Sequence, residues 1–135
     1  ALEQPVLAII ATTALTSILV TQDRIIDYNT GLAHAIYYAL TSFPQIEKDH
    51  LHGEVVGYGT LILLLADGQK EMFEKLYRFN RETGLPASLK DMGITREELP
   101  QIIEKTLAMK DIDHNPYPIT REMLQQAFEE LERRE

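Results

Sequence analysis

The sequence predicts an all-α protein, a bundle of six or seven helices. Apolar residues recur every three to four positions along almost the whole chain, as on one face of an α-helix, and no segment alternates apolar and polar residues as a strand does. The chain has 135 residues, of which 44% are hydrophobic and 25% are charged. This length and balance are typical of one globular domain whose core needs no disulfide bonds.

The first half of the chain contains three predicted helices. Residues 5–20 form the first, because they are mostly apolar and their leading proline suits a first helical turn. Residues 31–43 form the second, which Pro44 ends, since the residue before a proline avoids the helical region. A polar loop is expected over residues 44–51, and residues 52–66 form the third helix.

The third predicted helix, residues 52–66, is apolar on nearly all sides, which indicates a helix surrounded by others. Four of its side chains are expected to be nearly fully buried: Val56, Leu61, Leu63 and Leu64. Three glycines weaken this helix and predict that a neighbouring backbone or a ligand comes close to them: Gly53, Gly57 and Gly59.

An amphipathic helix is predicted next, over residues 69–81, and a Gly-Leu-Pro sequence at residues 84–86 ends it. A short helical piece is expected at residues 88–92. The side chains of the amphipathic helix that should face inward are Met72, Phe73, Leu76, Tyr77 and Phe79.

Two capping residues mark the last helices. Thr95 and Glu98 have the spacing of a capping box, which opens a helix that runs to about Lys110. Residues 111–119 contain two prolines and are expected to form a loop. Thr120 then caps a final helix.

Composition excludes several functional classes. The 13 basic and 21 acidic residues give a formal charge of −8, which disfavours nucleic acid and anionic membrane surfaces as partners. No apolar run reaches the length of roughly 18–20 residues that a membrane-spanning helix needs. The chain has no cysteine, which excludes thiol catalysis, iron–sulfur clusters and cysteine-ligated zinc and fits a cytoplasmic location.

Four histidines are the candidates for site chemistry: His34, His50, His52 and His114. His34 lies in the first turn of the second predicted helix, and His52 opens the third. The segment between them is long enough to bring the chain back, so both imidazoles can lie at one end of the bundle. Helix N-termini disfavour a protonated imidazole, and the neutral ring is the form that binds a metal. The pair is therefore a candidate metal site.

The same residues also have simpler interpretations. A histidine at a helix start is commonly a cap or a surface residue, and two histidines 18 positions apart carry little information by spacing alone. His50 is expected to be solvated, and His114 to lie in a turn. The sequence contains no glycine-rich phosphate loop after a strand and no Gly-x-Ser-x-Gly nucleophile motif.

Two segments resemble one family. Residues 31–36 (GLAHAI) and 51–60 (LHGEVVGYGT) are similar to the two histidine-bearing helices of the iron-containing (group III) alcohol dehydrogenase superfamily, and most similar to its glycerol dehydrogenase branch. The later helices also fit the C-terminal half of such proteins. The resemblance implies a parent protein with an N-terminal domain that binds NAD(P), absent from this chain. Residues 1–135 are then a single all-helical, metal-ligating C-terminal domain.

The resemblance also implies the roles of particular residues. His34 and His52 match the two histidine ligands of zinc or iron, and the acidic third ligand is expected upstream of Ala1, although Asp27 or a neighbouring molecule could replace it. The bound metal polarises the alcohol oxygen so that hydride leaves for the nicotinamide. No catalytic residue beyond the metal ligands is expected in the chain.

Departures from the family pattern leave the substrate open among small alcohols and polyols. Tyr37 stands where the branch has a second histidine, Val55 where it has a lysine, and residues 24–30 where it has a glycine-rich segment. Three interpretations follow. The chain is the C-terminal domain of an alcohol or polyol dehydrogenase, inactive alone; or a stand-alone helical relic or interaction module that holds no metal; or a dehydroquinate synthase-like or glycerol-phosphate dehydrogenase-like member.

A domain separated from its neighbour should show the apolar surface that the neighbour covered. Leu2, Val6 and parts of residues 24–33 are the candidates for this surface. We therefore expect self-association, or association with the missing N-terminal domain, through it.

Overall fold

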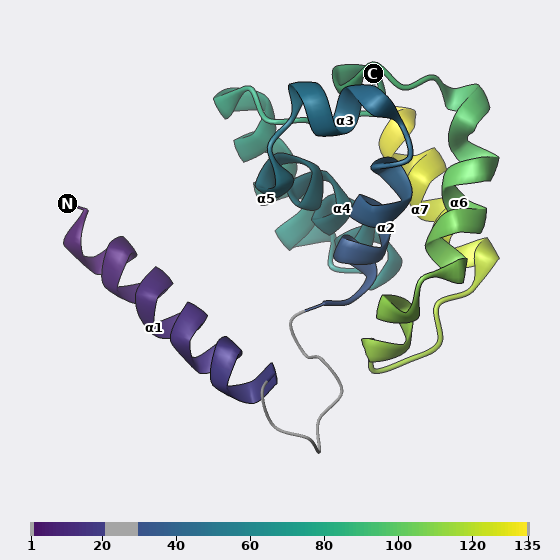
Figure 1. Ribbon diagram of the computed structural model, residues 1–135. Coiled ribbons are helices and arrows are strands. Elements are labelled where there is room, and N and C mark those ends of the chain that lie inside the picture. The colour runs from purple at the N-terminus through teal and green to yellow at the C-terminus, as the bar shows by residue number, and fades with distance from the viewer. Residues whose placement is uncertain (1, 21–29, 135) are drawn as a thin grey trace. The chain divides into compact units, whose positions relative to one another are not determined.

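The computed structural model describes residues 2–20 and 30–134, and all regular structure within them is helical (Figure 1). The prediction of an all-α fold is confirmed. The α-helices and 3-10 helices (η) of the described residues are α1 (Glu3–Val20), α2 (Leu32–Leu40), α3 (Pro44–Asp49), α4 (His52–Ala66), α5 (Lys70–Thr83), η1 (Lys90–Met92), η2 (Arg96–Glu98), α6 (Leu99–Ala108), η3 (Lys110–His114) and α7 (Arg121–Glu132).

The chain divides into two compact units, Ala1–Thr30 and Gly31–Glu135, each of which is described by itself. In the first unit, α1 and the residue before it leave large apolar side chains exposed, and these are Leu2, Val6, Leu7, Ile9, Ile10 and Leu15. No helix of the described residues is long and apolar enough to cross a membrane. That residues 1–135 act as one domain stays a prediction.

The described candidates for the expected apolar surface differ in their exposure. Leu2 and Val6 are exposed, whereas Leu32 and Ala33 are buried in the core of the second unit. Residues 24–29 of the same predicted surface lie outside the described residues. Self-association through this surface stays a prediction.

Helix α4 forms the centre of the second unit and contacts α2, α5 and α7 (Figure 1). The central position was predicted, but of the four side chains expected to be nearly fully buried only Leu61 is. The buried face of α4 follows the spacing of three to four residues and consists of Val55, Tyr58, Gly59 and Ile62 together with Leu61. Val56, Leu63 and Leu64 lie beside this face and are half-buried, because the neighbouring helices cover α4 on only part of its circumference.

The segment predicted as a polar loop over residues 44–51 is largely a helix, α3. Pro44 stands at its first position, where the fixed φ of proline suits a helix start and the missing N–H is not needed. The side chain of Ile46 is 1% exposed and attaches this short helix to the core. Pro44 therefore begins α3. It also follows α2, which already ends at Leu40.

The inward face of α5 differs from the prediction at two of five positions. Phe73 is buried, and Leu76 and Tyr77 are half-buried, as expected. Met72 and Phe79 are more than half exposed, so their predicted burial is wrong. Each precedes a buried residue of α5, Phe73 or Asn80, by one position, and one position on a helix turns the side chain by roughly 100°.

The predicted caps are confirmed. The Glu98 carboxylate accepts a 2.9 Å hydrogen bond from the Thr95 amide and closes the capping box before α6. The Thr120 hydroxyl accepts one of 3.2 Å from the Met123 amide at the start of α7. Gly84 ends α5 in the left-handed conformation, with φ 76°, as the predicted stop requires.

A phenol–carboxylate contact joins the loop before α7 to the end of α4 and leads to a prediction for alkaline pH. The Tyr117 hydroxyl donates a 2.6 Å hydrogen bond to Asp67 Oδ1. Burial, reinforced by the Asp67 carboxylate, raises the pKa of Tyr117 from 10.0 to about 12. The folded chain therefore keeps a proton that the unfolded chain releases over this interval, and the stability from this group is lost as the pH rises through it.

Ultraviolet absorbance titration should show one of the six tyrosines ionising near pH 12. Tyr117→Phe should remove the amplitude of one tyrosine from that step, and Asp67→Asn should move this amplitude part of the way back, because burial is the larger cause. A step that keeps its full amplitude in Tyr117→Phe would belong to other tyrosines, such as the buried Tyr58, whose hydroxyl also donates to a carboxylate, and would contradict the assignment.

Candidate metal site

The two predicted metal ligands lie side by side. His34 is the third residue of α2 and His52 is the first residue of α4. Their ring centroids are 5.5 Å apart, with the ring planes inclined at 45°. His34 is half-buried and His52 is exposed, so the pair is open to solvent on one side. The expected convergence of the two imidazoles is confirmed, and their binding of a metal stays a prediction.

The donor set and the spacing of the rings fit a zinc or iron ion. Imidazole nitrogen is a common ligand of both metals. In a tetrahedral zinc site with Zn–N distances of about 2.0–2.1 Å, the centres of two bound imidazoles lie roughly 5–6 Å apart. Among residues 2–20 and 30–134 no three histidine, aspartate or glutamate side chains gather as a metal site. Asp27, proposed as a third ligand, lies outside the described residues.

Glu54 holds the start of α4, where His52 lies. Its Oε2 accepts a 3.1 Å hydrogen bond from the Leu51 amide, so the third residue of the helix reaches back to its N-cap. The same oxygen lies 3.4 Å from Nδ1 of His50. The expectation that His50 is solvated is therefore wrong: its side chain is mostly buried beside this carboxylate.

Asn115 holds the start of α2, where His34 lies. Its Oδ1 accepts a 3.1 Å hydrogen bond from the amide of Leu32, the first residue of the helix. A β-carbon on Gly31 would come within 2.9 Å of the same oxygen. The glycine before the helix therefore leaves room for a capping side chain that is 83 positions away in the sequence.

Tyr37, which stands where the family branch has a second histidine, packs against the candidate site. Its ring meets His52 edge to face, with centroids 4.5 Å apart. His52 is thus in contact with two rings of α2, His34 on one turn and Tyr37 on the next. The tyrosine restricts the orientation of the His52 ring.

Of the three glycines of α4, only one meets a neighbouring backbone. A β-carbon on Gly59 would lie 2.6 Å from the carbonyl oxygen of Ala33. Gly53 has nothing within 4 Å of that position, and at Gly57 the nearest atom is an amide nitrogen of Asn80, at 4.0 Å. The predicted close approach of a backbone is therefore confirmed at Gly59 and is not seen at Gly53 and Gly57, where approach of a ligand stays a prediction.

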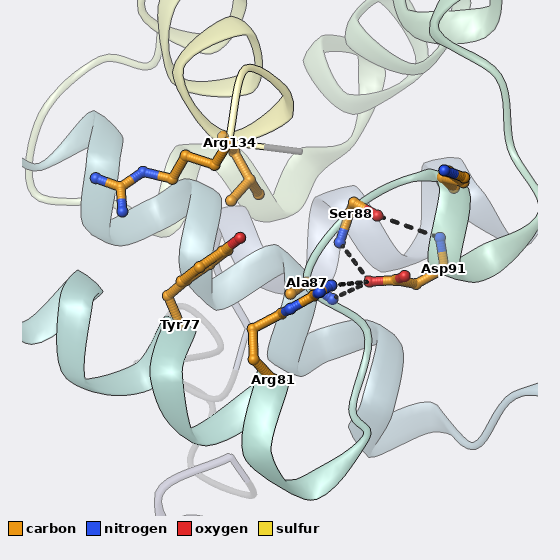
Figure 2. Close-up of a pocket in the computed structure, with 8 residues that line it drawn as sticks. Tyr77, Arg81, Ala87, Ser88, Asp91 and Arg134 are labelled. Atoms are coloured by element: carbon orange, nitrogen blue, oxygen red, sulfur yellow. Dashed lines mark hydrogen bonds and ion pairs between the residues drawn. The ribbon is translucent and has the colours of Figure 1, made fainter.

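A separate hollow of about 300 Å³ lies between α5, η1 and the end of α7 (Figure 2). Its charged residues Arg81, Asp91 and Arg134 each have a partner. The Asp91 carboxylate accepts hydrogen bonds of 3.0 and 3.1 Å from the amides of Ala87 and Ser88 and lies 3.8 Å from Arg81. The guanidinium of Arg134 points away from Asp91 and pairs with Glu74, whose pKa it lowers by its hydrogen bond. This hollow lacks the imidazole pair and is a weaker candidate site.

The comparison with known families identifies the chain. A model described as the C-terminal part of the Fe-containing alcohol dehydrogenase family matches residues 28–131. The chain belongs to the Fe-containing alcohol dehydrogenase family. The matched residues include both His34 and His52, so the resemblance carried by two short segments extends over almost the whole second unit.

Individual relatives match a large part of the chain. A glycerol dehydrogenase of Thermotoga maritima is 39% identical over an alignment of 93 residues, and the match covers 65% of this chain and 25% of that protein. Hydroxycarboxylate dehydrogenase A of Escherichia coli is 32% identical over an alignment of 104 residues, and the match covers 74% of this chain and 28% of that protein. The crystal structure of a probable glycerol dehydrogenase from Sinorhizobium meliloti superposes with a TM-score of 0.67 at 29% identity, over 76% of this chain and 30% of that one. The chain thus spans between a quarter and a third of the length of these relatives.

Proposed function

We propose that the chain is the metal-ligating C-terminal domain of an NAD(P)-dependent alcohol or polyol dehydrogenase similar to glycerol dehydrogenases. The observation that carries the proposal is the pairing of His34 and His52, whose ring centroids are 5.5 Å apart at the starts of two packed helices. The names of the relatives support a small hydroxylated substrate, since they include glycerol dehydrogenases, a hydroxycarboxylate dehydrogenase and a glycolaldehyde reductase.

In this proposal the side chains of the described residues bind the metal ion and orient the ring of one ligand. His34 and His52 each offer one neutral ring nitrogen to zinc or iron, and Tyr37 keeps the His52 ring in place by its edge-to-face contact. The bound metal would polarise the oxygen of an alcohol and so favour loss of hydride to a nicotinamide. The third, acidic ligand and the nicotinamide site come from outside the described residues.

Two other interpretations remain as outcomes of the test. A stand-alone helical relic or interaction module would keep the fold and bind no metal. A dehydroquinate synthase-like or glycerol-phosphate dehydrogenase-like member would bind metal and act on a different substrate. The curated relatives named above favour the dehydrogenase. The cysteine-free composition fits a protein of the cytoplasm.

A zinc titration of the 135-residue chain tests the proposal. Isothermal calorimetry should detect one weak zinc site per chain, because two imidazoles are fewer than the three protein ligands of a typical catalytic zinc site. Cobalt(II) in place of zinc should give a visible absorption spectrum that zinc abolishes. A chain that binds neither ion at millimolar concentration would favour the non-catalytic module.

We expect no dehydrogenase activity from residues 1–135 alone. Dinucleotide sites of this kind are built on βαβ units, and the described residues contain no strand. Absorbance of NADH or NADPH should therefore stay at background when the chain is mixed with NAD or NADP, zinc or iron(II), and glycerol or simple diols. Measurable reduction of either nucleotide would show that the chain carries its own nicotinamide site and contradict the assignment of that site to another domain.

A further inference from the structure

The crossing of α2 and α4 depends on one glycine. Gly59 is buried, and a β-carbon there would lie 2.6 Å from the Ala33 carbonyl oxygen and 3.1 and 3.2 Å from the Ala33 Cα and carbonyl carbon. All three neighbours are backbone atoms, which cannot rotate away as the end of a side chain does. Any residue other than glycine at position 59 therefore forces the two helices apart, because ordinary van der Waals contact begins only at 3.4 Å.

This crossing point is directly connected to the histidine pair. Ala33 precedes His34 in the first turn of α2. On α4, His52 and Gly59 are seven residues apart, which is about two turns and places them on the same face of the helix. The first turn of α2 therefore lies over one face of α4, in contact with Gly59 through Ala33 and beside His52 through His34.

We propose that Gly59 is a positioning residue that sets the separation of the His34 and His52 rings. The proposal rests on the proposed function, in which the two imidazoles share one metal ion. Metal–ligand distances tolerate deviations of only about 0.2 Å. A methyl group at position 59 displaces the backbone one residue before His34, and the displacement moves the Cα atom that carries the ring.

The matched glycines of α4 provide the controls. Gly59→Ala, Gly57→Ala and Gly53→Ala make the same chemical change in the same helix, but only the first places the methyl group against backbone. Ile62→Val, at a fully buried position of α4, removes a methyl group from the core without adding one at the crossing. It controls for loss of stability as such.

Two measurements are made on the full chain. Zinc affinity is determined by competition with a chromophoric chelator. The proximity of the rings is measured without metal, from the nuclear Overhauser effect between the His34 and His52 ring protons. These protons can be assigned because the chain has only four histidines. Circular dichroism verifies that each variant keeps the helix content of the unmodified chain.

We expect Gly59→Ala to lose zinc affinity by about tenfold or more, comparable to the loss of an outer-shell partner, and to lose the ring-to-ring Overhauser effect. Gly57→Ala, Gly53→Ala and Ile62→Val should keep both. A folded Gly59→Ala with unchanged ring proximity overturns the proposal. So does a Gly59→Ala that loses its helix content while Gly57→Ala keeps it, because Gly59 would then serve the fold as a whole. If the unmodified chain binds no zinc, the proposed function fails, and the metal-free Overhauser measurement still decides whether Gly59 sets the spacing.

Discussion

Replacement of either His34 or His52 by alanine should abolish zinc binding by the chain. The candidate site among the described residues brings two imidazoles together and no third ligand, so each substitution leaves a single protein ligand for the ion. Loss of an outer-shell partner of a metal site costs roughly 10–100-fold in affinity, and loss of one of two direct ligands should cost at least as much. Isothermal calorimetry of the two variants should therefore show no zinc binding above background.

The other two histidines provide the controls. His50→Ala and His114→Ala remove the same side chain from positions outside the pair and should leave the zinc affinity within about twofold, since neither is a proposed ligand. Helix content should be unchanged in all four variants, because no histidine belongs to the buried core. If His34→Ala and His52→Ala bound zinc like the unmodified chain, the pair would not be the metal site. If only His50→Ala lost zinc binding, the metal site would instead include the His50 side chain beside Glu54.

Hydrophobic periodicity predicts most helices of the second unit correctly. It fails where one residue allows two interpretations. The period identified α4 at its observed bounds, and the capping residues Thr95 and Thr120 placed α6 and α7. It missed α3, because Pro44 was interpreted only as a stop and a proline also suits a helix start. It overestimated the inward face of α5, since a run of apolar residues does not reveal which of two adjacent positions, such as Met72 and Phe73, is buried.

The candidate site was predictable to the extent that its residues are local in the sequence. His34 and His52 were found from two short motifs, and the carboxylate of Glu54 could have been found from its position three residues after the N-cap of α4. Asn115 could not, because it caps α2 from 83 positions away and no local pattern marks that contact. The difference between Gly59 and its neighbours Gly53 and Gly57 likewise depends on which side of α4 the helix α2 crosses.

The second large effect concerns the attachment of α4 to the rest of the unit. Glu132, the last residue of α7, is 3% exposed, and its Oε1 accepts a 2.8 Å hydrogen bond from the Tyr58 hydroxyl of α4. The same carboxylate accepts the amide of Leu89, at 3.1 Å. One buried carboxylate thus connects α4, α7 and the segment before η1. Because His52 and Tyr58 lie on the same helix, this network also fixes the element that carries one proposed metal ligand.

Glu132→Ala should lower the free energy of unfolding by about 2–6 kcal/mol, because it leaves two buried donors without their acceptor and each buried group left unsatisfied costs about 1–3 kcal/mol. Urea denaturation followed by circular dichroism measures the change. Glu132→Gln keeps an acceptor oxygen in the same place and should lose less, whereas Glu130→Ala, at an exposed position of α7, should change stability by no more than about 0.5 kcal/mol. Tyr58→Phe should cost less in the Glu132→Ala background than alone, since the two side chains share one hydrogen bond. Equal stability of Glu132→Ala and Glu130→Ala would mean that the buried carboxylate contributes nothing to holding α4 in place.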